Sequence, residues 1–124
     1  MVRETGRNGR RPATGVGKDA EDAAAAYLAA VGMRVLARNV RGPGGEIDIV
    51  AADGETIVFV EVKARSSRTF GSALGAVDAR KRRRIRATAE EYLQFVAPLA
   101  RGRFDVVTVE PSGVTLHRNA FGWP

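Results

Sequence analysis

Cysteine is absent from this chain of 124 residues, and histidine and tryptophan occur once each. The lack of cysteine excludes a disulfide framework and a zinc site built on thiolates, and it fits a reducing, cytoplasmic environment. The one histidine, His117, has no partner at the spacing of a metal site or a catalytic triad. Histidine and thiol chemistry are therefore not expected here.

Long apolar runs are missing as well. No stretch approaches the length of a membrane span, and residues 1–14 are basic and polar, without the apolar segment of a secretory signal. We therefore expect a cytoplasmic protein that has no membrane partner.

Positive charge is what the chain has in excess. Twenty Lys and Arg residues against fourteen Asp and Glu residues give a net charge of +6. This balance favours a polyanionic partner, and nucleic acid is the commonest one. The abundance of arginine and alanine could instead reflect the composition of the genome, so charge alone leaves both explanations open.

The length allows one compact domain, and a hydrophobic fraction of 44% is enough to fill its core. Residues 1–16 are rich in arginine and glycine, so they are predicted to be a flexible basic arm before a domain over residues 17–124. Asp19 is a candidate N-cap for the first helix, and Gly32 is expected to end it.

The predicted element order is α-β-β-β-α-β-β. This order indicates a single α/β domain with a central mixed five-stranded sheet flanked by helices. A glycine-rich loop is expected between the first two strands. The helices are predicted at about 19–32 and 77–97, the strands at 33–40, 45–51, 56–63, 103–110 and 114–118, and the loop at 41–45.

The second and third predicted strands carry charged residues at the centre of the sheet. An Asp-Gly pair between them favours a tight hairpin. Strand alternation puts Glu46 and Asp48 on one face and Ile47 together with Ile49 on the other. The apolar run that precedes Glu61 indicates a strand buried on both faces.

Buried charges need a partner or a metal ion. Mg²⁺ prefers oxygen ligands, and Asp48, Glu61 and the carbonyl oxygen of Val62 could supply them. A metal there would lower the pKa of a bound water, and Lys63 could stabilise the resulting hydroxide and the charge on a phosphate. The alternative is a pair of surface salt bridges from Lys63 to Glu61 or Glu46.

The second predicted helix begins with a dense group of cations. Cations at a helix N-terminus oppose the macrodipole and repel one another, so a phosphate-binding role is predicted, with a solvated face as the alternative. Such contacts position a nucleic acid without reading its sequence. The group comprises Arg80, Lys81, Arg82, Arg83, Arg84 and Arg86, with Arg65 and Arg68 upstream.

Asp105 alternates with Arg103 on the fourth predicted strand. Pairing with a neighbouring arginine is the expected role of this carboxylate, and support of Lys63 is the alternative.

Three ordered stretches, Gly45–Val50, Val58–Arg65 and Arg103–Val107, resemble the motifs of the YraN-like family of small bacterial proteins. Asp48 followed after twelve residues by Glu61-Val62-Lys63 also resembles the PD-(D/E)XK pattern of nucleases. The resemblance covers about residues 17–119. It implies a restriction-endonuclease-like fold, similar to that of archaeal Holliday-junction resolvases.

The resemblance also implies roles for individual residues. Asp48, Glu61 and, on the first helix, Glu21 match the metal-binding carboxylates of the catalytic site. Lys63 matches the catalytic lysine, and Glu46 has a supporting place. Glu21 enters this set through the resemblance alone.

The leading hypothesis is an endonuclease that uses Mg²⁺ or Mn²⁺ to hydrolyse phosphodiester bonds in DNA. Branched or structured DNA is expected because no sequence-reading module is visible, and a homodimer would match the two-fold symmetry of a branched substrate. A non-catalytic nucleic-acid-binding protein on the same fold is the alternative. A third hypothesis treats the charges as the surface of an interaction protein.

Overall fold

The computed structural model describes residues 3–4, 15–65 and 79–122. Within these residues the chain forms two helices and six strands, of which the first has only two residues. Together with the five longer strands, the element order confirms the predicted α/β fold. The elements are β1 (Arg3–Glu4), α1 (Gly15–Ala30), β2 (Arg34–Gly42), β3 (Gly45–Asp53), β4 (Thr56–Ala64), α2 (Ala79–Val96), β5 (Arg101–Glu110) and β6 (Gly113–Phe121).

All strands lie in one mixed sheet, in the spatial order β1-β2-β3-β4-β5-β6. Neighbouring strands are antiparallel except β4 and β5, which are parallel and are connected through α2. The parallel ladder runs from Thr56–Arg101 to Ala64–Val109 and continues with a hydrogen bond of 2.9 Å from the Arg65 N–H to the Val109 carbonyl. β4 is therefore an interior strand with a partner on both sides.

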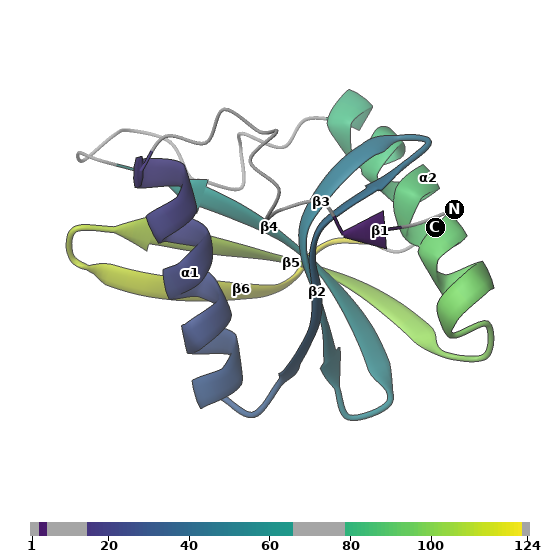
Figure 1. Cartoon of the computed structure of the whole chain (residues 1–124), viewed down its shortest axis with the longest axis horizontal. Helices are drawn as coiled ribbons and strands as arrows, with labels where there is room; N and C mark the ends of the chain where they lie inside the picture. The colour runs from purple at the N-terminus through teal and green to yellow at the C-terminus, as the bar shows by residue number, and fades with distance from the viewer. Residues whose placement is uncertain (1–2, 5–14, 66–78, 123–124) are drawn as a thin grey trace.

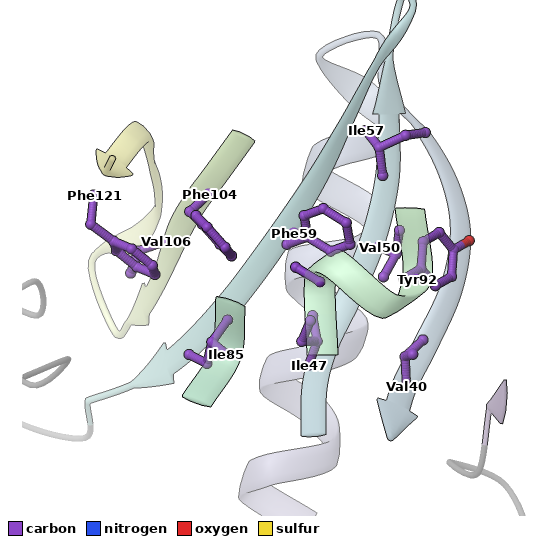
Figure 2. Close-up of a cluster of buried hydrophobic side chains, with 11 residues drawn as sticks. Val40, Ile47, Val50, Ile57, Phe59, Ile85, Tyr92, Phe104, Val106 and Phe121 are labelled. Carbon is purple, nitrogen blue, oxygen red and sulfur yellow. The ribbon is translucent and has the colours of Figure 1, made fainter. Parts of the chain in front are cut away.

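Each helix covers one face of the twisted sheet (Figure 1). On the α1 side, Ala24 and Leu28 pack against β3, β4 and β5. On the α2 side, Phe59 lies within a buried cluster with Tyr92 and Phe104 (Figure 2). The centre of its ring is 5.8 Å from the ring centres of both residues. Because both faces of β4 are covered, the predicted burial of this strand is confirmed.

Neither helix that the structure describes is long and apolar enough to cross a membrane.

Two local predictions are wrong. Helix α1 begins at Gly15, so Asp19 lies inside the helix instead of capping it. The expected loop over 41–45 is a tight turn, because β2 continues to Gly42 and β3 starts at Gly45. A side chain on Gly44 would overlap the backbone carbonyl of Arg84, so the glycine allows the backbone of α2 to approach.

The two residues of β1 pair with Arg41 and Val40 of β2. They fall within the predicted N-terminal arm, whose other residues, apart from the start of α1, lie outside the described part of the chain.

Candidate active site

Strands β3 and β4 part at the position of the candidate carboxylates. Their backbone pairing extends from Asp53–Thr56 to Ile49–Val60 and no further. Beyond that point, the Asp48 carboxylate accepts a hydrogen bond of 2.8 Å from the Val62 N–H. The carboxylate thus takes the place of a backbone acceptor and is fixed between the two strands.

The side-chain alternation of β3 changes at the same position. Ile47 packs in the core on the α2 side, whereas Ile49 packs in the core on the α1 side, so the prediction that they share a face is wrong. Across from Asp48, Asn39 has a φ of 53°, a left-handed conformation that interrupts the pleat of β2. Asp48 therefore lies where the regular side-chain alternation of both β2 and β3 is interrupted.

Glu61 and Lys63 lie on the α2 side of β4, in line with Phe59, as strand alternation predicts. Oε2 of Glu61 lies 3.4 Å from Nζ of Lys63 and 2.7 Å from Nζ of Lys81 on α2. Glu61 is only 9% exposed, so these contacts differ from the surface salt bridges considered from the sequence.

Lys81 therefore belongs to the carboxylate site rather than to a set of solvent-facing cations. It lies four residues before Ile85 and seven before Thr88, both of which are buried against the sheet. Residues at this spacing share one face of a helix. The helical period separates Lys81 from its basic neighbours, a distinction that the charge of the cluster alone does not reveal.

Glu21 reaches the site from α1 in a similar way. It is 8% exposed and lies on the buried stripe that contains Ala24 and Leu28. The Asn39 side-chain amide donates to Oε1 of Glu21 at 3.2 Å. Sequence reasoning missed Asn39, although asparagine tolerates the left-handed conformation that this position requires.

The electrostatics of the cluster are unfavourable for a carboxylate. Burial, followed by the nearby charge of Glu61, raises the pKa of Asp48 from 3.8 to about 8, although the Val62 N–H opposes the shift. Glu21 and Glu46 add smaller contributions in the same direction as Glu61. Three acidic side chains therefore act on Asp48 at the end of the β3–β4 pairing.

The pKa values of the two lysines shift in opposite directions. Burial lowers the pKa of Lys63, and the neighbouring Lys81 adds to this effect although Glu61 opposes it. Burial also acts to lower the pKa of Lys81, but the hydrogen bond and charge of Glu61 outweigh it, so the net pKa is raised. Lys81 is thus the more firmly charged partner of Glu61.

The donor chemistry of this cluster fits a hard divalent cation, because Asp48, Glu61 and Glu21 offer only carboxylate oxygens. Among the described residues, no three acidic or histidine side chains are arranged so that they could hold a metal ion. Mg²⁺ commonly uses one or two protein carboxylates and takes its other ligands from water and substrate phosphate. Asp48 and Glu61 are two carboxylates whose charges interact at the end of the β3–β4 pairing.

The predicted phosphate-binding cations are divided among different surroundings. The Arg82 guanidinium lies 5.4 Å from the centre of the Phe121 ring, and Arg86 donates to the Gly122 carbonyl at 3.0 Å. These two arginines attach α2 to the C-terminal strand. The exposed side chains of the group are those of Arg80, Arg83 and Arg84, and Arg68 lies outside the described residues.

Arg65 follows Lys63 by two residues and lines a cavity of about 370 Å³ between β4, β5 and the start of α1. Ala20 and Val109 contribute apolar surface to it, and Asp19 and Glu110 contribute acidic groups. Arg65 is therefore near the carboxylate site but on the α1 side of it.

A protein-family model described as "Uncharacterised protein family UPF0102" matches residues 20–109. A UPF0102 protein of Moorella thermoacetica is 51% identical over 112 residues, which cover 85% of this chain and 93% of the relative. One from Symbiobacterium thermophilum is 50% identical over 97 residues, 77% of this chain and 82% of the relative. One from Pseudomonas aeruginosa strain PAO1 is 47% identical over 98 residues, 77% and 78% of the two chains.

Proposed function

Because this chain belongs to the UPF0102 family, the YraN-like group that its motifs resemble, we propose that it is a metal-dependent endonuclease acting on DNA. The observation that carries the proposal is the position of Asp48 on β3 and Glu61 on β4, at the point where the backbone pairing of these two strands ends. A buried acid whose pKa is strongly raised by burial and by a neighbouring carboxylate, as that of Asp48 is, is typical of functional sites. A divalent cation would relieve their repulsion.

Asp48 and Glu61 would hold Mg²⁺ or Mn²⁺, with the Val62 carbonyl as a further oxygen donor. Glu21 does not form a three-carboxylate group with them among the described residues, so it would act on the bound ion through its charge. Such an ion supplies a water of lowered pKa and polarises the phosphodiester. The hydrogen bond from the Val62 N–H holds the Asp48 carboxylate in place before any ligand arrives. The side-chain amide of Asn39 likewise holds the carboxylate of Glu21 on α1 through a hydrogen bond.

Lys63 would stabilise the charge that develops during attack on phosphorus. Its side chain is 17% exposed and its ammonium lies 3.4 Å from Glu61. A cation held in a mostly buried place acts more strongly on a nearby anion than one in water does. Lys63 would thus orient the attacking hydroxide and stabilise the charge on the phosphate oxygens.

Arg80, Arg83 and Arg84 are exposed on the helix that delivers Lys81 to the site, so they would contact DNA phosphates beside the scissile bond. Phosphate contacts alone carry no sequence information. The proposed substrate is therefore DNA distinguished by its structure, such as a branched duplex.

A homodimer is part of the proposal because a branched duplex presents two strands related by a two-fold axis. Three apolar side chains near the C-terminal end of α2 are exposed: Phe95 by 67%, Val96 by 54% and Leu99 by 98%. Acidic Glu55 and basic Arg101 line the hollow beside Leu99, so a second copy could pair the opposite charges. Sedimentation of Leu99→Ser against wild type tests this surface.

Cleavage of a labelled four-way junction with Mg²⁺ tests the activity. Wild type should give discrete products, and Glu61→Ala and Lys63→Ala should each lose about 10²-fold or more in rate. A linear duplex of the same sequence controls for the preference for branched DNA. Equal cleavage by wild type and both variants would falsify the assignment.

A non-cleaving DNA-binding protein on the same fold is the second candidate. The ion pair between Glu61 and Lys81 favours it, because one candidate metal ligand already has a cationic partner. This candidate predicts salt-sensitive junction binding without any metal-dependent product.

A further inference from the structure

Lys81 occupies a position in the carboxylate site that the family resemblance did not assign. Its ammonium lies 2.7 Å from Oε2 of Glu61, which is the same oxygen that Lys63 approaches to 3.4 Å. The nearby Asp48 carboxylate also acts on Lys81 electrostatically. The Lys81 ammonium thus interacts with both leading metal-ligand candidates, Glu61 through direct contact and Asp48 through its charge.

Contacts farther along α2 hold Lys81 in this place. The Thr88 hydroxyl, seven residues on and on the same helix face, accepts from the Gly44 N–H at 2.9 Å and donates to the Gly45 carbonyl at 3.0 Å. Gly44 also packs directly on the helix backbone at Arg84. The β2–β3 turn therefore fixes the distance of α2 from the sheet, and with it the position of Lys81.

We propose that Lys81 is an exchangeable counter-ion of Glu61, which balances the carboxylate site without metal and leaves Glu61 when a divalent cation binds. This inference rests on the proposed metal-dependent function. An ammonium and a metal ion at Glu61 Oε2 compete for the negative charge of one carboxylate and repel each other at close range. Metal binding therefore works against the ion pair and favours departure of Lys81.

The properties of the Lys81 side chain suit exchange. It is 32% exposed, compared with 11% for the Glu61 side chain, so its flexible stem has access to solvent. A lysine ammonium is a point charge with rotatable donors, whereas an arginine fork is held by paired hydrogen bonds. Asp105, held by the Arg103 fork at 3.0 Å through both oxygens, is the contrasting arrangement in this molecule.

The experiment measures Mn²⁺ binding by titration calorimetry on the full chain, without DNA, for wild type, Lys81→Met, Lys81→Arg and Arg83→Met. Lys81→Met removes the ammonium with little change in volume, and Arg83→Met removes one exposed positive charge from the same helix. We expect Lys81→Met to bind Mn²⁺ about tenfold more tightly than wild type, because a close charge pair no longer competes. Arg83→Met should change the affinity less than twofold, and Lys81→Arg should bind Mn²⁺ more weakly than wild type, because an arginine fork leaves the Glu61 carboxylate less readily.

Thermal unfolding in EDTA and in saturating Mn²⁺ gives a second measurement. Lys81→Met should be less stable than Arg83→Met in EDTA, and saturating Mn²⁺ should remove the difference. A purely structural role would leave the difference in place, and that result would overturn the proposal.

The two proposals fail differently. If wild type binds Mn²⁺ and Lys81→Met binds it equally or more weakly, the exchange is wrong and the metal-dependent function stands. If only Lys81→Met binds Mn²⁺, the exchange is supported. If none of the proteins binds Mn²⁺ at millimolar concentration, the metal-dependent function fails and the exchange fails with it.

Discussion

The two ends of the backbone pairing between β3 and β4 carry carboxylates with opposite electrostatics. At one end, Asp53 lies 3.0 Å from Arg103 and 3.1 Å from Arg118, and the hydrogen bond from Arg103 is the main cause of its lowered pKa. At the other end, burial and the charge of Glu61 raise the pKa of Asp48 to about 8. The two aspartates are five residues apart on one strand.

The difference lies in how each acid is compensated. Asp105, which is fully buried, receives two hydrogen bonds of 3.0 Å from Arg103 and one of 2.8 Å from the Asn119 N–H. The group of Asp53, Arg103, Asp105 and Arg118 therefore balances its charges and is a structural network. At the Asp48 end, the acidic side chains repel one another, and among the described residues Asp48 has no comparable arginine partner. This repulsion lowers the stability of the fold unless a bound cation relieves it.

Asp105→Ala should have the largest effect and should act on stability. It leaves the Arg103 guanidinium without its bidentate partner and the Asn119 N–H without its acceptor, so we expect a loss of about 3–5 kcal/mol in the free energy of unfolding. Urea denaturation measures the loss. Asp53→Ala, which removes the more exposed acid, is the matched control and should cost about 1 kcal/mol or less. A small loss for Asp105→Ala would mean that the network is not structural.

Asp48→Asn should have the next largest effect, on cleavage. The asparagine oxygen can still accept from the Val62 N–H, so the fold is expected to persist, but the negative charge is lost. We expect the Mg²⁺-dependent rate on a four-way junction to fall about 10²-fold. Asp53→Asn on the same strand should cleave as wild type does. Loss of cleavage in both variants would remove the distinction between the two ends.

The same Asp48→Asn substitution should increase stability at alkaline pH. Since the folded-state pKa of Asp48 is raised, the folded protein binds more protons than the unfolded chain between about pH 4 and pH 8. The free energy of unfolding of wild type therefore falls across this window, and the variant lacks this contribution to the decline. We expect it to be more stable than wild type by on the order of 2 kcal/mol at pH 8, with a smaller gain at pH 5. Urea titrations at the two pH values measure this, and parallel pH profiles would contradict it.

Sequence patterns predicted the element order and the burial of β4 because those properties follow from periodicity and composition. The pairing of Asp105 with Arg103 was also expected and is confirmed. The surroundings of Asp48 depended on other facts: the backbone of Asn39 becomes left-handed, and pairing between β3 and β4 ends at Ile49. Strand alternation cannot predict such a change, since it assumes a continuous pleat.

The role of Lys81 depended on tertiary packing as well. Its charge suggested the same role as that of Arg83, and only the position of α2 against the Gly44 turn brings its ammonium to Glu61. Glu21 is a candidate through the family resemblance alone, since no local sequence pattern distinguishes it from Asp22 on the same helix. Its burial and its contact with Asn39 separate it from Asp22, which is exposed and pairs with Arg38 at 2.8 Å.

The smallest predicted effect concerns the arginines of α2, which also divide into compensated and available charges. Arg82 contacts Phe121 and Arg86 contacts Gly122, whereas Arg83 and Arg84 are exposed. The double variant Arg83→Ala/Arg84→Ala should weaken junction binding several-fold at physiological salt. It should also reduce the slope of log K against log[salt] by up to about 2, because binding with two fewer phosphate contacts releases fewer counterions from the DNA. Its stability should change by less than about 0.5 kcal/mol.

Arg82→Ala is the matched control variant. It should lose about 0.5–1 kcal/mol of stability with its cation–π contact and keep most of the salt slope. Filter binding across a salt series distinguishes them, and equal slopes for the two variants would show that exposure on α2 does not decide which arginines meet DNA.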